Sequence, residues 1–234
     1  MVQEQKTDSA EQMLAELRAR IDKLDVQMMS SLEERISVSQ SISAAKSPGS
    51  AVYRPGREAE LMRRLVSDFP AVPQRLILSV WRVIMSSSIA MQKPDFAIAS
   101  TADGLMAATG LAAGQLHLLP VCSDAHEAVS LLSSAQADIA VISESELSLI
   151  ASEMGRDRKA VVIGSYPFSV TDENSSGGFV IGRDCADRSS SDQVFTYHPE
   201  TKEIVSTMLY GYEGSLADDS DDAICIGFRA SSAG

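Results

Sequence analysis

The stretch that decides the fold lies at residues 9–47 and reads SAEQMLAELRARIDKLDVQMMSSLEERISVSQSISAAKS. Its apolar residues recur at steps of three and four, which fit one face of a helix and not a strand. They are Leu14, Leu17, Ile21, Leu24, Met28, Leu32 and Ile36. Ser9 and Gln12 match a capping box at its start, and Pro48-Gly49 supplies a stop. At about 1.5 Å per residue the helix would be about 58 Å long, longer than a small domain is wide, so we expect it to need a partner.

This predicted helix carries three cations in a helical register, Arg18, Arg35 and Lys46. Arg35 and Lys46 fall about 20° out of register and about 16 Å apart along the axis. Their long side chains could therefore hold the two ends of a small anion. Arg18 points about 260° away from Arg35, toward a different neighbour. The alternative, which periodicity alone favours, is that all three are solvated positions of an amphipathic helix.

Charge is unevenly distributed along the chain. Residues 1–94 hold 13 Lys and Arg against 11 Asp and Glu, whereas residues 95–234 hold 7 against 21. The acidic half argues against binding nucleic acid or an anionic membrane surface, while the first half could attract a small anion. With no signal peptide and no apolar run of about 18 residues, we expect a cytoplasmic protein. The cysteines lack metal-ligand spacing and predict reduced thiols without a zinc site. They are Cys122, Cys185 and Cys225.

A second amphipathic helix is expected to follow the segment AVYRPGRE at residues 51–58 and to run to about Phe69. Arg54, Arg57 and Glu58 share one face at its start. Glu58 suits a helix N-terminus, whereas cations there oppose the helix dipole and favour a nearby anion. The alternative is a surface Arg–Glu pair.

A third helix is expected from about Pro73 to about Gln92, with apolar residues on more than one face. This pattern predicts packing on several sides. Ser88 and Gln92 are polar neighbours at i and i+4 on its last turns. They either end a buried helix or line a polar pocket.

These features together resemble the all-helical chorismate mutase domain, which also forms the front of bifunctional chorismate mutase–prephenate dehydratases. The resemblance covers about residues 9–93. It is carried by LRARIDKLD at 17–25, ER at 34–35, AK at 45–46 and YRPGRE at 53–58, followed by Ser88 and Gln92. It implies an intertwined homodimer, joined through the long first helix, that converts chorismate to prephenate in aromatic amino-acid biosynthesis.

The resemblance implies substrate-binding roles for five residues. Arg18 matches the arginine that each protomer lends to its partner's pocket. Arg35 matches the arginine that binds a substrate carboxylate within its own protomer, and Ser88 matches a serine near a carboxylate. Arg57 matches an arginine beside the residue that binds the ring hydroxyl. Arg54 occupies a position that carries Asp in some members and Arg in others, so its backbone is the expected contact.

Three more residues take catalytic roles by the same resemblance. Lys46 and Gln92 match the pair that hydrogen-bonds the ether oxygen of the breaking bond, and Glu58 matches the residue that holds the ring hydroxyl. The reaction is a unimolecular pericyclic rearrangement, which needs no nucleophile, metal or redox cofactor. Catalysis must therefore come from holding the compact diaxial conformer and from stabilising the negative charge that grows on the ether oxygen.

Two other functions stay open from the sequence. An isochorismate pyruvate-lyase has the same helical scaffold and also uses arginines and a lysine, although Glu58 and Gln92 together favour the mutase. A non-catalytic ligand-sensing protein is the other alternative. Against it stand Arg35, Lys46 and Glu58, since a decayed pocket would be expected to have lost at least one of them.

From Asp95 the pattern changes to short apolar strands that alternate with helices, which predicts a βαβ lobe with a parallel sheet. We therefore expect an all-helical domain at residues 1–94 and an α/β domain at residues 95–234. The expected strands are Phe96–Ala99, His117–Val121, Ile139–Ile142, Ala160–Ile163, Gly178–Ile181, Val194–Tyr197, Ile204–Tyr210 and Ala223–Phe228. The expected helices lie near Gly104–Ala108, Ala125–Ala135 and Glu144–Glu153. The last strands are expected to be antiparallel, with an acidic turn at Leu216–Asp222.

Over about residues 95–183 this half resembles prephenate dehydratase, whose fold is akin to periplasmic binding lobes. The resemblance rests on SDAHEAV at 123–129, ADIAVI at 137–142 and NSSGGFVIG at 174–182. The family's catalytic Thr and Arg are replaced by Gly177 and Gly178, which have no side chain for the chemistry and are expected to form a turn.

The dehydratase-like half is therefore expected to be degenerate and inactive. The loop STADG at residues 100–104 also lacks the glycine-proline-rich opening of the dehydratase family. His117, His126 and His198 form no recognisable cluster. The half is expected to be retained for packing, or as a sensor of a small effector such as an aromatic amino acid.

Overall fold

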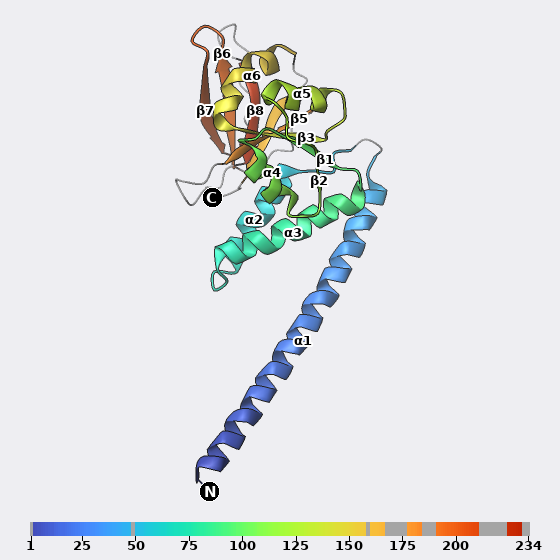
Figure 1. The fold of residues 1–234 in the computed structure, drawn as a ribbon, viewed down its shortest axis with the longest axis vertical. Helices are drawn as coiled ribbons and strands as arrows, with labels where there is room; N and C mark the ends of the chain where they lie inside the picture. Colours follow the sequence, from blue (N-terminus) through green and yellow to red (C-terminus); the bar gives the residue numbers. More distant parts are fainter. Residues whose placement is uncertain are drawn as a thin grey trace. The chain divides into compact units, whose positions relative to one another are not determined.

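The computed structural model describes residues 2–47, 50–157, 160–166, 177–183, 191–210 and 224–230 (Figure 1). The chain divides into two compact units, Met1–Ser50 and Ala51–Gly234. These units do not test the functional domains expected at residues 1–94 and 95–234, which stay a prediction. Among the described helices, none is long and apolar enough to cross a membrane.

The first unit is one long helix, α1 (Val2–Ala45), as the periodicity predicted. It begins well before the expected cap, so the capping box at Ser9 and Gln12 is wrong. The physical reason is the preceding segment VQEQK, which is rich in good helix formers and carries the helix further back. The predicted stop, Pro48-Gly49, lies outside the described residues.

Most of the apolar stripe of α1 is exposed. Leu14 is 51%, Leu17 50%, Ile21 57% and Leu24 50% exposed. Large apolar side chains left half in water along one helix face lose most of the free energy that their burial would supply. The expectation that this helix needs a partner stays a prediction.

The second unit begins with a helical pair, α2 (Pro55–Asp68) and α3 (Gln74–Gln92), which confirms the two predicted helices. Proline at the first turn of α2 suits a helix start, because its missing N–H would have no partner there. Ala59 and Met62 of α2 and Ile77 and Met85 of α3 are buried.

The rest of the second unit is an eight-stranded mixed sheet with three helices (Figure 1). The strands are β1 (Ala97–Ser100), β2 (His117–Leu118), β3 (Ile139–Ser143), β4 (Val161–Tyr166), β5 (Gly178–Gly182), β6 (Ser191–His198), β7 (Glu203–Tyr210) and β8 (Ile224–Ala230). The helices are α4 (Leu105–Ala112), α5 (Ala125–Ser133) and α6 (Glu144–Asp157). Every strand and helix expected in this half is present, with ends shifted by a few residues. The acidic turn at Leu216–Asp222 lies outside the described residues.

The prediction of a parallel sheet is only partly right. The strand order is β2-β1-β3-β5-β4-β8-β6-β7, and β1 pairs in parallel with both β2 and β3. Strand β5, however, lies between β3 and β4 and is antiparallel to both. All five of its residues, GFVIG, are buried, as expected for a central strand covered on both faces. The antiparallel pairing of the last strands, β6 with β7 and with β8, is confirmed.

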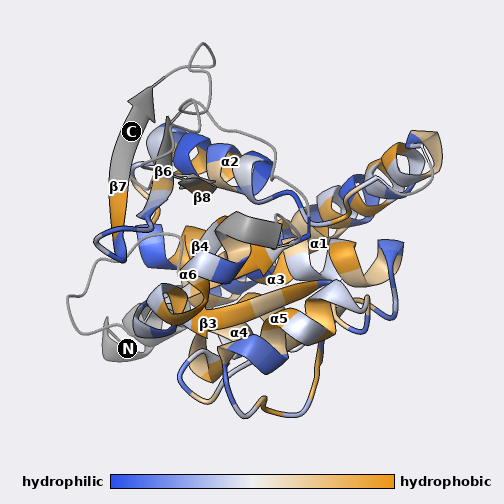
Figure 2. Ribbon diagram, turned by 90° about the horizontal axis from the view of Figure 1, so that it is seen from above, coloured by the Kyte–Doolittle hydropathy of each residue, from blue (hydrophilic) through white to orange (hydrophobic). Residues whose placement is uncertain are grey.

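Two apolar cores cover the two faces of the sheet. One contains residues of α5 and α6, among them Leu132 and Ile150. The other contains residues of α4 together with Ile89 of α3. Strand β3 runs between the cores and is apolar along nearly its whole length (Figure 2). Helix α3 of the predicted mutase region is therefore part of the core of the α/β lobe.

Candidate active site

Three predicted site residues belong to the first unit. Arg18 is exposed and Arg35 is half-buried on α1. Helix α1 ends at Ala45, so Lys46 is the first residue after it. The helical register assumed between Arg35 and Lys46 therefore ends one residue before Lys46. A backbone hydrogen bond from Lys46 N to Ser43 O at 3.3 Å continues the turn. How these three side chains meet the other five predicted site residues stays a prediction.

The second unit carries the residues at the start of α2. Arg54 is the N-cap residue, and its carbonyl accepts a 3.0 Å hydrogen bond from Glu58 N. The Arg54 side chain makes no capping hydrogen bond, and the Arg54 and Arg57 residues are exposed. Glu58 lies on the inner side of the helix, where only 15% of its side chain is exposed. The three residues therefore do not share one environment, because Arg54 and Arg57 face solvent while Glu58 faces the interior.

Glu58 is paired with an arginine that the sequence analysis missed. Arg82 of α3 donates from Nη2 to Glu58 Oε2 at 2.7 Å, and its side chain is 9% exposed. Burial alone would lower the pKa of Arg82, but the Glu58 carboxylate and Tyr53 raise it above the ordinary value. The pair is thus charged and mostly shielded from water. One signal was available, because Arg82 is a cation within the apolar run VWRVI of α3.

Ser88 and Gln92 lie together on the last turns of α3, as expected. Ser88 is buried, and its Oγ donates to Ile84 O at 2.9 Å. Gln92 is half-buried, and its Nε2 donates to Ser88 O at 3.1 Å. Both side chains are thereby held against their own helix, and these hydrogen bonds fix their orientation.

A different face of α3 binds the α/β lobe. Arg82, Ser86, Ile89 and Lys93 recur at i, i+4, i+7 and i+11 and so form one stripe. Buried Ser86 donates from Oγ to Leu111 O of α4 at 2.8 Å, and Ile89 is in the core of the lobe. Ser88 lies about 120° and Gln92 about 80° round the helix from Arg82. Helix α3 therefore presents its predicted site residues on one side while the lobe holds another.

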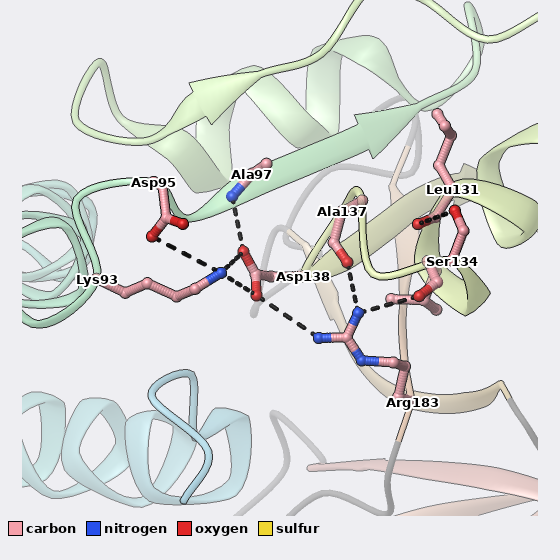
Figure 3. A network of polar contacts seen from close by, with 9 residues as sticks. Lys93, Asp95, Ala97, Leu131, Ser134, Ala137, Asp138 and Arg183 are labelled. Atoms are coloured by element: carbon pink, nitrogen blue, oxygen red, sulfur yellow. Dashed lines mark hydrogen bonds and ion pairs between the residues drawn. The ribbon is translucent and has the colours of Figure 1, made fainter. Parts of the chain in front are cut away.

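The stripe ends in a network around Asp138 (Figure 3). Lys93 Nζ lies 2.6 Å from both carboxylate oxygens of Asp138, which also accepts a 2.9 Å hydrogen bond from Ala97 N. Arg183 reaches the same carboxylate at 3.7 Å and donates to Ala137 O at 2.8 Å. Because Lys93 follows Gln92 directly, this network fixes the end of α3 to the start of β1 and β3.

Comparison with known families decides what this helical region is. Residues 17–93 match the model of the family described as chorismate mutase type II. This region is a chorismate mutase domain. The match supports an isomerase activity with chorismate as substrate, in aromatic amino-acid biosynthesis. The chain has no match among curated proteins or solved structures.

The chorismate mutase domain contains every predicted site residue, and it also contains Arg82. The match ends at residue 93, so the resemblance of the second half to prephenate dehydratase stays a prediction.

Beyond the chorismate mutase domain, the predicted turn at Gly177-Gly178 is wrong. Gly178 is the first residue of β5 and pairs with Ser143 on one side and Tyr166 on the other. A Cβ on Gly178 would lie 2.8 Å from Ala107 Cβ and 2.8 Å from Val141 Cγ1. Glycine is required here because a helix and a strand approach this backbone too closely for any side chain.

The carboxyl ends of β1 and β3, where open α/β sheets commonly bind ligands, are filled by the protein's own side chains. Glu146 Oε2 accepts hydrogen bonds from Thr101 Oγ1 at 2.7 Å and from Ser143 N and Oγ at 2.8 Å. The bond from Ser143 N to the Glu146 carboxylate is one half of a capping box at the start of α6. This arrangement is explained by helix capping and gives no sign of a ligand.

The remaining titratable groups show no second reaction centre in the described part of the chain. His126 lies 2.8 Å from Glu153 on the surface. Burial raises the pKa of the Cys122 thiol, which keeps it protonated and unreactive. Among the described residues, no group of three or more His, Cys, Asp or Glu side chains could hold a metal ion.

Proposed function

We propose that the chain rearranges chorismate to prephenate. The observation that carries this proposal is the match of residues 17–93 to chorismate mutase type II, a span that includes all eight predicted site residues. In the proposed pocket Arg35 and the partner protomer's copy of Arg18 hold the two substrate carboxylates. Bidentate arginine–carboxylate pairs fix orientation as well as position, which the diaxial conformer requires.

Charge stabilisation is the second part of the proposal. Lys46 and Gln92 donate to the ether oxygen, where negative charge grows as the C–O bond breaks. Glu58 accepts a hydrogen bond from the ring hydroxyl. Support for these roles comes from Gln92, which is half-buried and held by Ser88 O, and from Glu58, which is mostly shielded from water. Donors that are already oriented stabilise the transition state without reorganisation.

We further propose that two copies of the chain pair through α1. Support comes from its exposed apolar stripe, which includes Leu17, Ile21 and Leu24. A second copy is the occupant that this face suits, because a helix pair buries matching stripes at steps of three and four. Such a dimer would place Arg18 in the pocket of the partner protomer.

The α/β lobe is proposed to be a dehydratase-like, periplasmic-binding-like fold without dehydratase activity. Gly178 carries this proposal, since the close approach of Ala107 and Val141 leaves no room for the missing arginine. We propose that the lobe now serves the mutase by packing against α3. Unchanged mutase kinetics in the presence of phenylalanine, tyrosine or tryptophan would support packing alone, whereas altered kinetics would point to an effector site.

The test of the proposed reaction offers the purified protein chorismate and isochorismate separately. A mutase forms prephenate from chorismate and releases no pyruvate from isochorismate. Pyruvate released from isochorismate, with chorismate left unchanged, would instead identify a lyase. If neither compound reacts, but one protects the protein against thermal unfolding, the chain is a binding protein.

A further inference from the structure

The ion pair between Glu58 and Arg82 is buried, and the proposed mechanism gives Arg82 no role. It joins α2 to α3 at 2.7 Å, with 15% of the Glu58 side chain and 9% of the Arg82 side chain exposed. A buried pair of this kind is weak evidence for a stabilising role, because the cost of desolvating both charges offsets much of their attraction. Replacing a buried ion pair by apolar residues of similar volume is often neutral or even stabilising.

The environment of Arg82 is unusual in a second respect. Its guanidinium carries five N–H donors, and its Nε has no hydrogen-bond partner within the described residues. A buried donor without an acceptor is costly and calls for an explanation. Arg82 is therefore held in a position that leaves its Nε without an acceptor while its Nη2 donates to Glu58.

The surroundings of the pair come from three parts of the second unit. Tyr53, just before α2, and Tyr166, on β4 of the lobe, lie close enough to raise the pKa of Arg82. A Cβ built on Gly164 of β4 would lie 3.7 Å from the Tyr53 hydroxyl and 3.2 Å from Pro55 Cβ, so β4 packs directly on the start of α2. The lobe and both helices thus border the ion pair, and 15% of the Glu58 side chain stays exposed.

We infer that Arg82 is a positioning residue for the mutase reaction, which orients the Glu58 carboxylate to accept the hydrogen bond of the substrate's ring hydroxyl. This inference rests on the proposed function, because it needs Glu58 to contact the substrate. A carboxylate has about four acceptor sites on two oxygens, so it accepts from a guanidinium and a hydroxyl together. Arg82 acts through Glu58 and has no contact with the reacting atoms.

A double-mutant cycle tests the inference. The variants are Arg82→Met, Glu58→Gln and the double variant, with Arg82→Lys as the conservative change. Displacement of a binding group by about 1 Å can cost on the order of a hundredfold, so we expect Arg82→Met to lower kcat/KM by tenfold to a hundredfold. The double variant should be no worse than Glu58→Gln alone, and Arg82→Lys should recover part of the loss. Arg64→Met, the same change at an exposed arginine of α2, should leave kcat/KM unaltered.

A substrate analogue without the ring hydroxyl supplies a readout that a purely structural role would not move. Loss of Arg82 should matter little for this analogue, because Glu58 then has nothing to hold. The inference would be overturned if the losses of kcat/KM in the two single variants multiply in the double variant. It would also be overturned if Arg82→Met lowers kcat/KM equally with chorismate and with the analogue. If Arg82→Met does not fold, the same cycle is run with Arg82→Lys.

The wild-type protein separates the two possible failures. Wild-type protein that forms no prephenate would overturn the proposed function, and the inference with it. A second outcome separates the two claims. If the wild-type protein forms prephenate and Lys46→Ala abolishes this turnover, the proposed function stands. If the losses of Arg82→Met and Glu58→Gln then multiply in the double variant, only the role of Arg82 is overturned.

Discussion

At the scale of single residues, Lys46 carries the largest predicted effect. If it donates to the ether oxygen, Lys46→Ala should lower kcat by about a hundredfold to a thousandfold, the usual cost of removing one such donor. Lys46→Arg keeps a cationic donor and should retain part of the activity. The measurement is the initial rate of chorismate loss at saturating substrate. A near-normal rate for Lys46→Ala would remove this residue from the mechanism.

Gly178 gives a second prediction at this scale. Gly178→Ala places a Cβ 2.8 Å from both Ala107 Cβ and Val141 Cγ1, so a packed helix or strand must shift. We expect the free energy of unfolding to fall by about 1–3 kcal/mol, the usual cost of overpacking. Urea denaturation measures this change. Unaltered stability would mean that the close approach is soft and that a side chain could be accommodated.

The site residues differ in how far the sequence could specify them. Residues defined by local spacing, such as Ser88 and Gln92, lie where the helical repeat placed them. Arg82 could not be assigned, because its partner Glu58 is 24 positions away and is brought close only by the packing of α2 on α3. Periodicity reports which face a residue occupies and not which side chain it meets.

At the scale of elements, the Asp138 network tests how the lobe holds α3. Asp138→Ala removes the acceptor of Lys93 Nζ and of Ala97 N, and it should lower the free energy of unfolding by about 2–3 kcal/mol. Lys93→Met should cost only about 1 kcal/mol, because the Lys93 side chain is 35% exposed.

The matched control for this network is Asp95. Its carboxylate lies 3.9 Å from Lys93 Nζ with 84% of its side chain exposed, so Asp95→Ala should change stability by at most about 0.5 kcal/mol. Chemical denaturation of the three variants measures the order. A loss at Asp95 as large as that at Asp138 would contradict the account of the network.

Strand and helix positions followed from local pattern, but sheet order did not. The run GFVIG indicated a buried strand at β5, yet alternation of strands and helices could not show that it lies between β3 and β4. That placement depends on Gly178, whose missing side chain allows α4 and β3 to come close. The start of α1 was misplaced for a simpler reason, since a good cap sequence at Ser9 does not stop a helix whose preceding residues also favour it.

At the scale of the whole molecule, the dimer is the main prediction. If Arg18 acts in the partner's pocket, Arg18→Ala and Arg35→Ala subunits should each be nearly inactive alone. Hybrid dimers contain one intact pocket, so an equal mixture should recover about a quarter of wild-type activity. Activity of the re-associated mixture is the measurement, with hybrid formation verified by differently tagged chains.

The matched control mixes Arg35→Ala with Lys46→Ala. Both residues are predicted to serve the pocket of their own protomer, so every hybrid pocket lacks one of them and no activity should return. Activity that returns in this control would refute the cross-protomer assignment. So would a mixture of Arg18→Ala and Arg35→Ala that stays inactive although hybrid dimers have formed.

The sequence also left open how the acidic half relates to the mutase domain. In the structure α3 belongs to both, because its stripe from Arg82 to Lys93 packs on the lobe while Ser88 and Gln92 face elsewhere. A boundary near residue 94 therefore separates two patterns in the sequence, whereas the packing of Ile89 and Ser86 crosses it.

The most direct test of the account follows chorismate absorbance with the purified protein and identifies the products. The account predicts that chorismate disappears, that prephenate accumulates, and that no phenylpyruvate forms. Phenylpyruvate would contradict the inactive lobe, and chorismate that is not consumed would contradict the mutase itself.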